Sequence, residues 1–186
     1  MVGVKMRLSK EQWLQGALEA RCRGGVAAVR VEPLAAQLGV TKGSFYWHFK
    51  NRRELLLAVL GEWERLGTGA IIELVESGSD DPKAQLQALI ATAFASEPQT
   101  DAIETAIRDW ARSEALAAEA TGRVDERRLE FVATRLRRLG LSPAKARRRG
   151  RLLYRTMIGE FHWRSSGGPG STPKELKELL ELLVAP

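Results

Sequence analysis

The chain has 186 residues, a formal net charge of +6, 44% hydrophobic residues and a single cysteine. This length suffices for a buried core without disulfides or metal, and Cys22 with His48 and His162 offers too few ligands for a structural zinc site. No stretch approaches the roughly 20 apolar residues of a membrane span, and residues 1–8 lack the apolar run of a signal peptide. We therefore expect a soluble, cytoplasmic chain with no cofactor, no metal and no membrane partner.

The positive charge is concentrated at the N-terminal end. Residues 1–58 hold ten of the 29 Lys and Arg residues but only four of the 23 acids, so the whole excess of +6 lies there and the remainder is neutral. A basic module joined to a neutral body is the charge distribution of a protein that meets a polyanion with one end. The first third of the chain is therefore the expected nucleic-acid-binding end.

A first helix is predicted from about Lys10 to the residue before Gly24-Gly25. Ser9 and Gln12 stand at the spacing of a capping box, and the glycine pair ends the helical pattern. Along the whole chain, strand-like alternation is absent and apolar residues recur three and four positions apart, which predicts an all-α fold. The stripe that the first helix is expected to bury comprises Leu14, Ala17, Leu18 and Cys22.

A helix-turn-helix is predicted between Val31 and Leu55. Pro33 suits the first turn of a short helix that Gly39 closes, and Thr41 can cap the helix that follows the turn. In this motif the second helix normally lies in the major groove of DNA. The side chains that this helix turns outward are therefore candidates for DNA contacts.

Helical geometry divides this second helix into a core face and a DNA face. Phe45 and Phe49 lie four residues apart and are assigned to the core. A step of about 100° per residue then turns the residues around them to the opposite side. That outward side comprises Gly43, Ser44, Tyr46 and Trp47.

Two large aromatic side chains and a glycine on an outward face fit a DNA surface better than a face that meets only solvent. Gly43 allows close approach of the backbone, and the hydroxyls of Ser44 and Tyr46 can bond a phosphate or a base edge. Trp47 can pack on the sugar-phosphate backbone, although packing on a neighbouring helix is an alternative. Lys42 stands at the helix N-terminus, where the dipole also favours a phosphate.

The run Thr-Lys-Gly-Ser-Phe-Tyr-Trp-His-Phe at residues 41–49, followed by Arg-Arg-Glu-Leu-Leu at residues 52–56, resembles the DNA-binding signature of the TetR family. The resemblance covers roughly residues 9–60. It implies a three-helix DNA-binding domain, taken as residues 1–55, followed by a helical ligand-binding and dimerisation domain at residues 56–186. The implied groove or phosphate contacts are Thr41, Lys42, Ser44, Tyr46, His48 and Arg52, the last in place of a phosphate-binding lysine.

Two residues depart from the family pattern. Arg30 stands where a small hydroxyl residue is common, and we count it among the expected DNA contacts. Cys22 stands where an aromatic residue is common, which alters the packing of the first helix. We interpret this cysteine as a small buried hydrophobe and not as a redox sensor.

Six further helices are predicted beyond the motif, which makes about nine in total. The first of the six begins near Arg52 and either frays near Gly67 or runs on to Val75. Residues 77–82 form a loop, and the Gly- and Ser-rich segment 165–173 connects the last two helices. The later apolar stripes lie at Leu86–Phe94, Ile103–Trp110, Leu129–Leu139, Leu152–Phe161 and Leu176–Leu183.

The aromatic residues of the helical body raise the question of a ligand site, because a bundle can enclose an apolar cavity. Core packing explains each aromatic equally well, but the resemblance favours a pocket built by the helices after the motif. His162 or Asp109 would supply polarity there. With few charges pointing inward, the expected effector is a small apolar or aromatic molecule. The candidate wall residues are Trp63, Trp110, Phe131 and Tyr154.

A homodimer is predicted through the last two helices. The apolar stripe of the last helix is wide for a C-terminal segment, and Met157 and Phe161 of the preceding helix offer a matching surface. A two-fold interface of four helices would set two recognition helices about 34–36 Å apart, or somewhat more, to match a palindromic site. The stripe comprises Leu176, Leu179, Leu180 and Leu183.

These predictions combine into one functional hypothesis: a repressor that binds a palindromic double-stranded DNA operator as a dimer and is released by a small ligand. An enzyme is disfavoured because no nucleophile elbow, paired carboxylates or metal cluster supplies a catalytic site. An architectural or adaptor DNA-binding protein without an effector, and an activator of the same fold, stay open as alternatives. The arginine-rich segment 147–155 is interpreted as a solvated or salt-bridged helix face, with Glu126 and Glu130 as partners.

Overall fold

The computed structural model describes residues 8–95 and 97–185, and Lys5 and Arg7 of the predicted basic module lie outside that range. Every regular element within the range is helical, as predicted, and none of its helices is long and apolar enough to cross a membrane. The elements are α1 (Lys10–Ala28), α2 (Val31–Gln37), α3 (Lys42–Phe45), α4 (Arg52–Glu64), the π-helical turn η1 (Arg65–Gly69), α5 (Ala70–Gly78), α6 (Pro82–Phe94), α7 (Pro98–Ala111), α8 (Ala115–Arg138), α9 (Pro143–Ser165) and α10 (Pro173–Val184).

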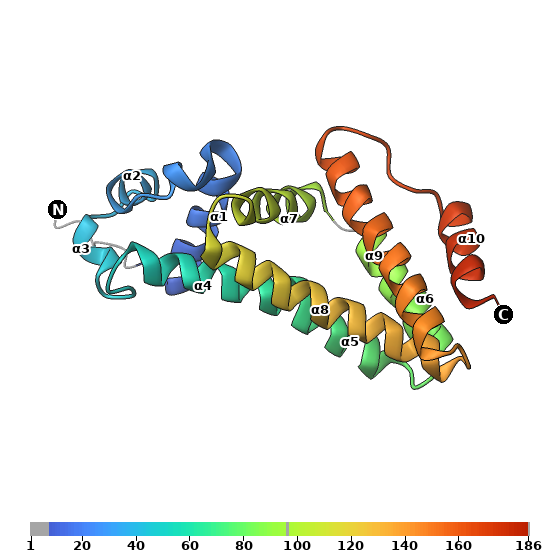
Figure 1. Cartoon of the computed structure of the whole chain (residues 1–186). Helices are drawn as coiled ribbons and strands as arrows, with labels where there is room; N and C mark the ends of the chain where they lie inside the picture. The colour runs from blue at the N-terminus through green and yellow to red at the C-terminus, as the bar shows by residue number, and fades with distance from the viewer. Residues whose placement is uncertain (1–7, 96, 186) are drawn as a thin grey trace.

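The long helices connect two ends of an elongated molecule. α1, α2 and α3 form one end, and α6, α9 and α10 form the other, with α8 running between them beside α4 and α5 (Figure 1). Because α4, η1 and α5 follow one another without a break, the described residues form nine helical rods, in agreement with the prediction. The helix that enters the N-terminal end is thus continuous with the body.

Each end has its own hydrophobic core. The first core gathers α1 to α4 with α7 and the start of α8, and it contains Trp13, Phe45 and Trp110. The second core gathers α5, α6, α9, α10 and the remainder of α8, and it contains Phe94 and Leu136. Since α4 belongs to the first core and continues into α5 in the second, a change in one core can be transmitted to the other through a single rod.

α1 departs from the prediction at its C-terminal part. The regular helix breaks at Gly24-Gly25 as predicted, and Gly25 has φ of +67°, but a short helical segment continues to Ala28. Cys22 is exposed, so its assignment to the buried stripe is wrong. The buried face of α1 instead includes Arg21. The guanidinium of Arg21 lies 5.8 Å from the ring of Trp110 and donates a hydrogen bond to the Ala106 carbonyl at 2.8 Å.

The helical rod that begins at Arg52 continues past Val75, which agrees with the longer of the two predicted alternatives. Asn51 caps it, accepting a hydrogen bond from the Glu54 backbone N–H at 2.9 Å. It does not fray near Gly67 but passes through η1, where the wider π-helical turn buries Thr68. The turn therefore lies where the N-terminal end joins the body.

The last two helices pack differently from the prediction. Leu180 and Leu183 are buried within the chain, where α10 lies against α6 and α9. Met157 and Phe161 line an internal cavity, so they do not offer the outward surface predicted for dimerisation. Exposed apolar side chains on these two helices are Leu152, Trp163 and Leu182.

The arginine-rich segment at the start of α9 makes salt bridges, as predicted. Arg147 lies 2.9 Å from Glu126 of α8. Glu130 pairs with Arg137 at 2.5 Å and not with a residue of α9, so that part of the prediction is wrong. Arg149 donates to the carbonyls of Leu183 and Ala185, which fixes the end of α10 against α9.

Candidate nucleic-acid interface and cavity

The second helix of the motif is short but has the predicted faces. α3 is one helical turn, and the chain continues as turns through His48. Phe45 and Phe49 are buried, with the Phe45 ring edge-on to Trp13 at 5.4 Å between centroids. Thr41 occupies the N-cap position, but its hydroxyl accepts no hydrogen bond from α3 in the described structure, so the predicted cap is wrong in that detail. The rigid aromatic packing beneath α3 fixes the face above it.

The outward face of α3 has the predicted residues. Tyr46 is 55% exposed and Trp47 is 73% exposed, which are unusual values for large aromatic side chains. Gly43 is also exposed, with only the Thr41 hydroxyl, 3.7 Å away, near the position that a Cβ would occupy. Ser44 is half-buried at the edge of this face. The face is therefore open to a large partner.

A shallow groove beside α3 brings together residues from both helices of the motif. Arg30, Glu32, Lys42 and Tyr46 line it. The ammonium of Lys42 donates to a Glu32 carboxylate oxygen at 2.6 Å, and this bond raises the pKa of Lys42 and lowers that of Glu32. An acid therefore competes with any phosphate for the lysine that the sequence assigns to DNA.

His48 and Arg52 have intramolecular partners that the sequence does not reveal. His48 Nε2 lies 2.8 Å from the Leu8 carbonyl, to which it donates as an N–H. Arg52 Nε donates to the Val29 carbonyl at 2.6 Å, which ties the start of α4 to the segment before α2. Both bonds join segments distant in sequence, so no local pattern predicts them. They hold the edges of the α3 face, and a phosphate contact by either residue stays a prediction.

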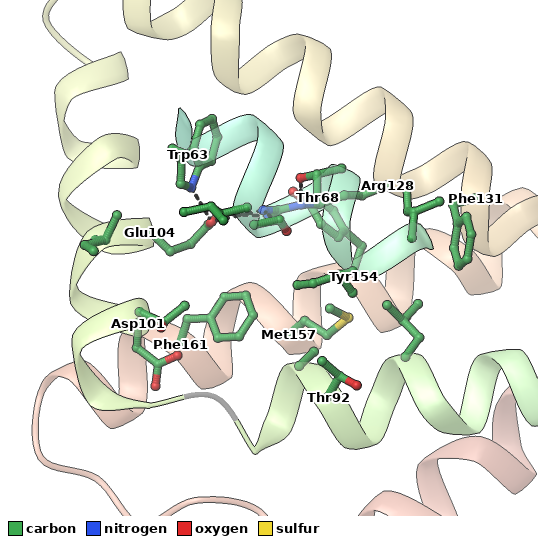
Figure 2. A pocket seen from close by; sticks show the side chains of 18 of the residues that line it. Trp63, Thr68, Thr92, Asp101, Glu104, Arg128, Phe131, Tyr154, Met157 and Phe161 are labelled. Atoms are coloured by element: carbon green, nitrogen blue, oxygen red, sulfur yellow. Dashed lines mark hydrogen bonds and ion pairs between the residues drawn. The ribbon is translucent and has the colours of Figure 1, made fainter. Parts of the chain in front are cut away.

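A cavity of about 180 Å³ lies in the helical body. Of the four predicted wall residues, Trp63, Phe131 and Tyr154 line it (Figure 2). Trp110 does not, because it is buried in the first core, and neither His162 nor Asp109 is part of the wall. Further residues of the wall that the prediction missed include Leu66, Thr92, Asp101, Glu104, Arg128, Met157 and Phe161.

A buried ion cluster forms the polar side of the cavity. Glu104 of α7 accepts hydrogen bonds from Trp63 Nε1 at 2.9 Å and from Arg128 at 3.0 and 3.2 Å (Figure 2). It also accepts a hydrogen bond from Arg108 at 2.8 Å. Arg128 of α8 also donates to the Thr68 hydroxyl at 2.8 Å and to the Gly67 carbonyl at 3.0 Å. One carboxylate and one guanidinium thus connect α7, α8, α4 and the π-helical turn.

The charge state of Glu104 follows from these contacts. Burial raises the pKa of a carboxyl group, but Arg128, Arg108 and the Trp63 N–H outweigh it, so the pKa of Glu104 lies below its ordinary value of 4.5. Glu104 is therefore an anion at neutral pH. Its two arginine partners make the cluster a compensated set and not an isolated buried charge.

A second set of polar groups lies behind Tyr154. The Tyr154 hydroxyl donates to Asp125 at 2.6 Å and accepts from Arg108 at 2.6 Å, while Arg108 also binds Asp125 at 2.8 Å. Burial raises the pKa of Tyr154 above its ordinary range, and the bond to Asp125 adds to this. Across the cavity, Asp101 pairs with Arg164 at 2.8 Å. The wall is thus mostly apolar, and its acidic and basic side chains are paired with one another or with neighbours behind the wall.

Sequence comparison relates the N-terminal end to known regulators. A family model described as bacterial regulatory proteins, tetR family, matches residues 14–59. The transcriptional regulator TtgR of Pseudomonas putida is 38% identical over 52 residues, which are 28% of this chain and 25% of TtgR. The class D tetracycline repressor of Escherichia coli is 38% identical over 56 residues, which are 30% of this chain and 26% of that repressor. The matched segment thus spans about a quarter of these relatives.

Solved structures share the fold over nearly the whole chain. The ketosteroid transcriptional regulator KstR2 of Mycobacterium tuberculosis has a TM-score of 0.71 and 17% identity, covering 99% of this chain and 97% of its own. FadR of Bacillus subtilis, in complex with stearoyl-CoA, has a TM-score of 0.73 and 20% identity, covering 95% of this chain and 98% of its own. Residues 14–59 thus match the tetR family model, and the chain as a whole shares the fold of these regulators.

The family match coincides with the N-terminal geometry described above. Residues 14–59 contain the α3 face and most of its groove, so these features lie in the segment that resembles the transcriptional regulators. Among the described residues, there is no group of three or more His, Cys, Asp or Glu side chains placed to hold a metal ion.

Proposed function

We propose that this chain is a TetR-family repressor that binds a palindromic operator as a homodimer and is released when a small apolar or aromatic molecule enters the cavity. The observation that carries this proposal is the position of Trp63. Its ring lines the cavity, and it stands on α4, the helix that Arg52 ties to the segment before α2. A ligand in the cavity therefore touches the same rod that supports the DNA-binding end.

Relatives give independent support for an effector. The class D relative carries the name tetracycline repressor, and the FadR structure contains stearoyl-CoA. Both are proteins of this family or fold, and this chain has a mostly apolar cavity in the corresponding body. Ligand-released repression is thus the simplest function that uses both ends of the molecule.

On the DNA side, the exposed face of α3 is the proposed reader of the operator. Tyr46 and Ser44 would bond base edges or phosphates, Trp47 would pack on the backbone, and Gly43 would allow the close approach. The remaining proposed contacts stand at the rim of this face or at the start of the neighbouring helices. They are Arg30, Thr41, Lys42, His48 and Arg52.

The proposed dimer uses the outward faces of α9 and α10. Leu152 is 61% exposed, Trp163 is 57% exposed and Leu182 is 72% exposed, so apolar surface is open on both helices. Pairing two such faces by a two-fold axis would bury them and set two α3 faces on one side of the assembly. This arrangement replaces the interface through Met157 and Phe161 that the sequence suggested.

Release follows from linkage between the cavity and the DNA face. A ligand lowers operator affinity only to the extent that it prefers the conformation that does not fit DNA. In this chain, a ligand that displaces Trp63 would tilt α4, and the bond between Arg52 and the Val29 carbonyl would pass that tilt to the start of α2. The α3 face would then move out of register with the major groove.

The test is selection of bound sequences from random duplex DNA with the purified full chain, followed by a salt titration on the best site. We expect an enriched palindrome and steep loss of affinity with salt, because several phosphates are neutralised at once. Binding of a single half-site by a monomer would contradict the dimeric operator. Absence of any enrichment would contradict the proposed sequence-specific function.

A further inference from the structure

The charged side chains of the cavity wall already have partners within the chain. Glu104 is bound by two arginines and Trp63, and Arg128 divides its donors between Glu104 and the π-helical turn. At the rim, Glu62 pairs with Arg65 at 2.7 Å. Asp101 is only 1% exposed and is held by Arg164. A ligand that enters the cavity therefore meets ions whose hydrogen bonds are in use.

The aromatic rings of the wall are also matched with cations. Each of four rings has a guanidinium on one side, and each of these guanidiniums is paired with an acid. The ring contacts are Arg128 with Trp63 at 5.6 Å, Arg135 with Phe131 at 3.4 Å, Arg108 with Tyr154 at 5.8 Å and Arg164 with Phe161 at 5.8 Å. The acids that pair with these arginines are Glu104, Glu76, Asp125 and Asp101.

This arrangement disfavours charged ligands of either sign. A cation stacked on one of these rings would lie across the ring from a guanidinium, so the usual cation–π attraction would be opposed by repulsion. An anion could bind Arg128 only by displacing Glu104, which would leave a buried carboxylate without its partner. Moving an ion out of water without a new partner is strongly unfavourable, and so is breaking one half of a buried pair.

We infer that the effector of this cavity is an uncharged lipophilic molecule, and that the compensated Glu104–Arg128 pair is what excludes acids and amines. The inference rests on the proposed ligand-released function and specifies the chemistry of its ligand. The remaining wall supports it, because Leu66, Ile71, Leu89 and Val132 offer apolar contacts and Thr92 offers a neutral hydroxyl. Burial of apolar surface would thus supply most of the affinity.

The experiment compares matched probes that differ only in head-group charge. Decanol, decanoate and decylammonium, and the corresponding naphthalene alcohol, carboxylate and ammonium compounds, are titrated into the full chain at neutral pH. Binding is measured by calorimetry and by the shift of the thermal unfolding midpoint. We expect the alcohol to bind at least roughly tenfold more tightly than either ion on the same scaffold.

A variant that removes the charge of Glu104 tests whether the Glu104–Arg128 pair causes the exclusion of charged ligands. Glu104→Gln removes the anion but keeps the shape, so Arg128 loses its acid while Arg108 keeps Asp125, and the preference should shift from the alcohol toward the carboxylate. Glu130→Gln on the exposed face of α8, which pairs with Arg137, is the matched control and should keep the wild-type ranking. A purely structural role for Glu104 would weaken all probes alike and would not reorder them.

The outcomes separate this inference from the proposed function. Tighter binding of decanoate or decylammonium than of decanol to the wild-type chain would overturn the inference, and so would failure of all six probes to bind. Neither result would affect operator selection, which tests the proposed function by itself. If Glu104→Gln does not fold, the ranking of the wild-type probes still decides whether the cavity rejects ionised ligands.

Discussion

At the scale of single residues, the proposed DNA face contains an acid that would oppose DNA binding. Glu32 binds Lys42 at 2.6 Å, and both side chains are largely exposed. If Lys42 contacts a phosphate as proposed, it must exchange this carboxylate for the phosphate, and the carboxylate would repel the DNA backbone. The pair would therefore moderate the affinity for DNA.

Replacing this acid should tighten DNA binding. We expect Glu32→Gln to increase affinity several-fold at low salt and less at high salt, because the removed repulsion is between exposed charges and is screened. Fluorescence anisotropy with the selected operator measures the change. Glu126→Gln, which breaks the exposed pair with Arg147 on the body, is the control and should leave affinity unchanged. Equal affinities of Glu32→Gln and the wild type would mean that Glu32 does not face the DNA.

Tyr46 provides the test of the outward face itself. Its side chain is 55% exposed, so Tyr46→Ala should leave the thermal midpoint nearly unchanged while lowering operator affinity roughly tenfold or more. Leu74→Ala, which removes an exposed apolar side chain on α5, should change neither quantity. Unchanged operator affinity in the Tyr46 variant would show that another face of the domain reads the DNA.

Protonation of Glu104 should make the stability of the fold sensitive to low pH. Because the pKa of its carboxyl group is lowered in the folded chain, its contribution to stability is present above the ordinary pKa of 4.5 and is lost as pH falls through the folded-state value. We expect the free energy of unfolding to fall more steeply below pH 4.5 in the wild type than in Glu104→Gln. Denaturant unfolding at each pH measures this free energy. An equal pH dependence in the wild type and in Glu104→Gln would show that Glu104 does not cause the loss of stability.

At the scale of elements, the spacing of apolar residues predicts structure well wherever a helix buries only one of its faces. It predicts the helix order, the Gly39 and Gly24-Gly25 breaks and the α3 faces, because each depends on neighbours along the chain. The spacing does not predict the environment of Trp110. It indicates that an aromatic side chain in an apolar stripe is buried, but not in which of the two cores. It also misses Arg128, whose partners at Gly67 and Glu104 lie far away in sequence on other helices.

The π-helical turn is the element whose stability depends most on one side chain. Arg128→Met should cost about 3–5 kcal/mol, since it breaks a buried pair and removes the donors to the Gly67 carbonyl and the Thr68 hydroxyl. Hydrogen exchange should accelerate most at Arg65–Gly69. Arg148→Met, at an exposed position of α9, is the control. Uniform acceleration over all helices would indicate general destabilisation and not release of this turn.

At the scale of the whole molecule, the proposed function requires two copies held at a fixed spacing. The exposed leucines of α9 and α10 lie at the end opposite α3, so a dimer formed there would leave both DNA faces open (Figure 1). Burying large apolar side chains across a two-fold axis favours association, and a lysine at the same position would bring two charges into an apolar contact. Leu182, the most exposed of these leucines, is the position where this cost is easiest to measure.

Leu182→Lys should therefore convert the dimer to a monomer without unfolding it, because the native side chain is 72% exposed in the single chain. Sedimentation at matched concentrations measures the change, and Leu74→Lys on α5, at a position 61% exposed, should remain a dimer. Operator affinity should fall in Leu182→Lys alone, because two half-sites can then be occupied only by independent binding events. A Leu182→Lys variant that stays dimeric would place the interface on another surface, and the spacing of the two α3 faces would have to be derived from that surface instead.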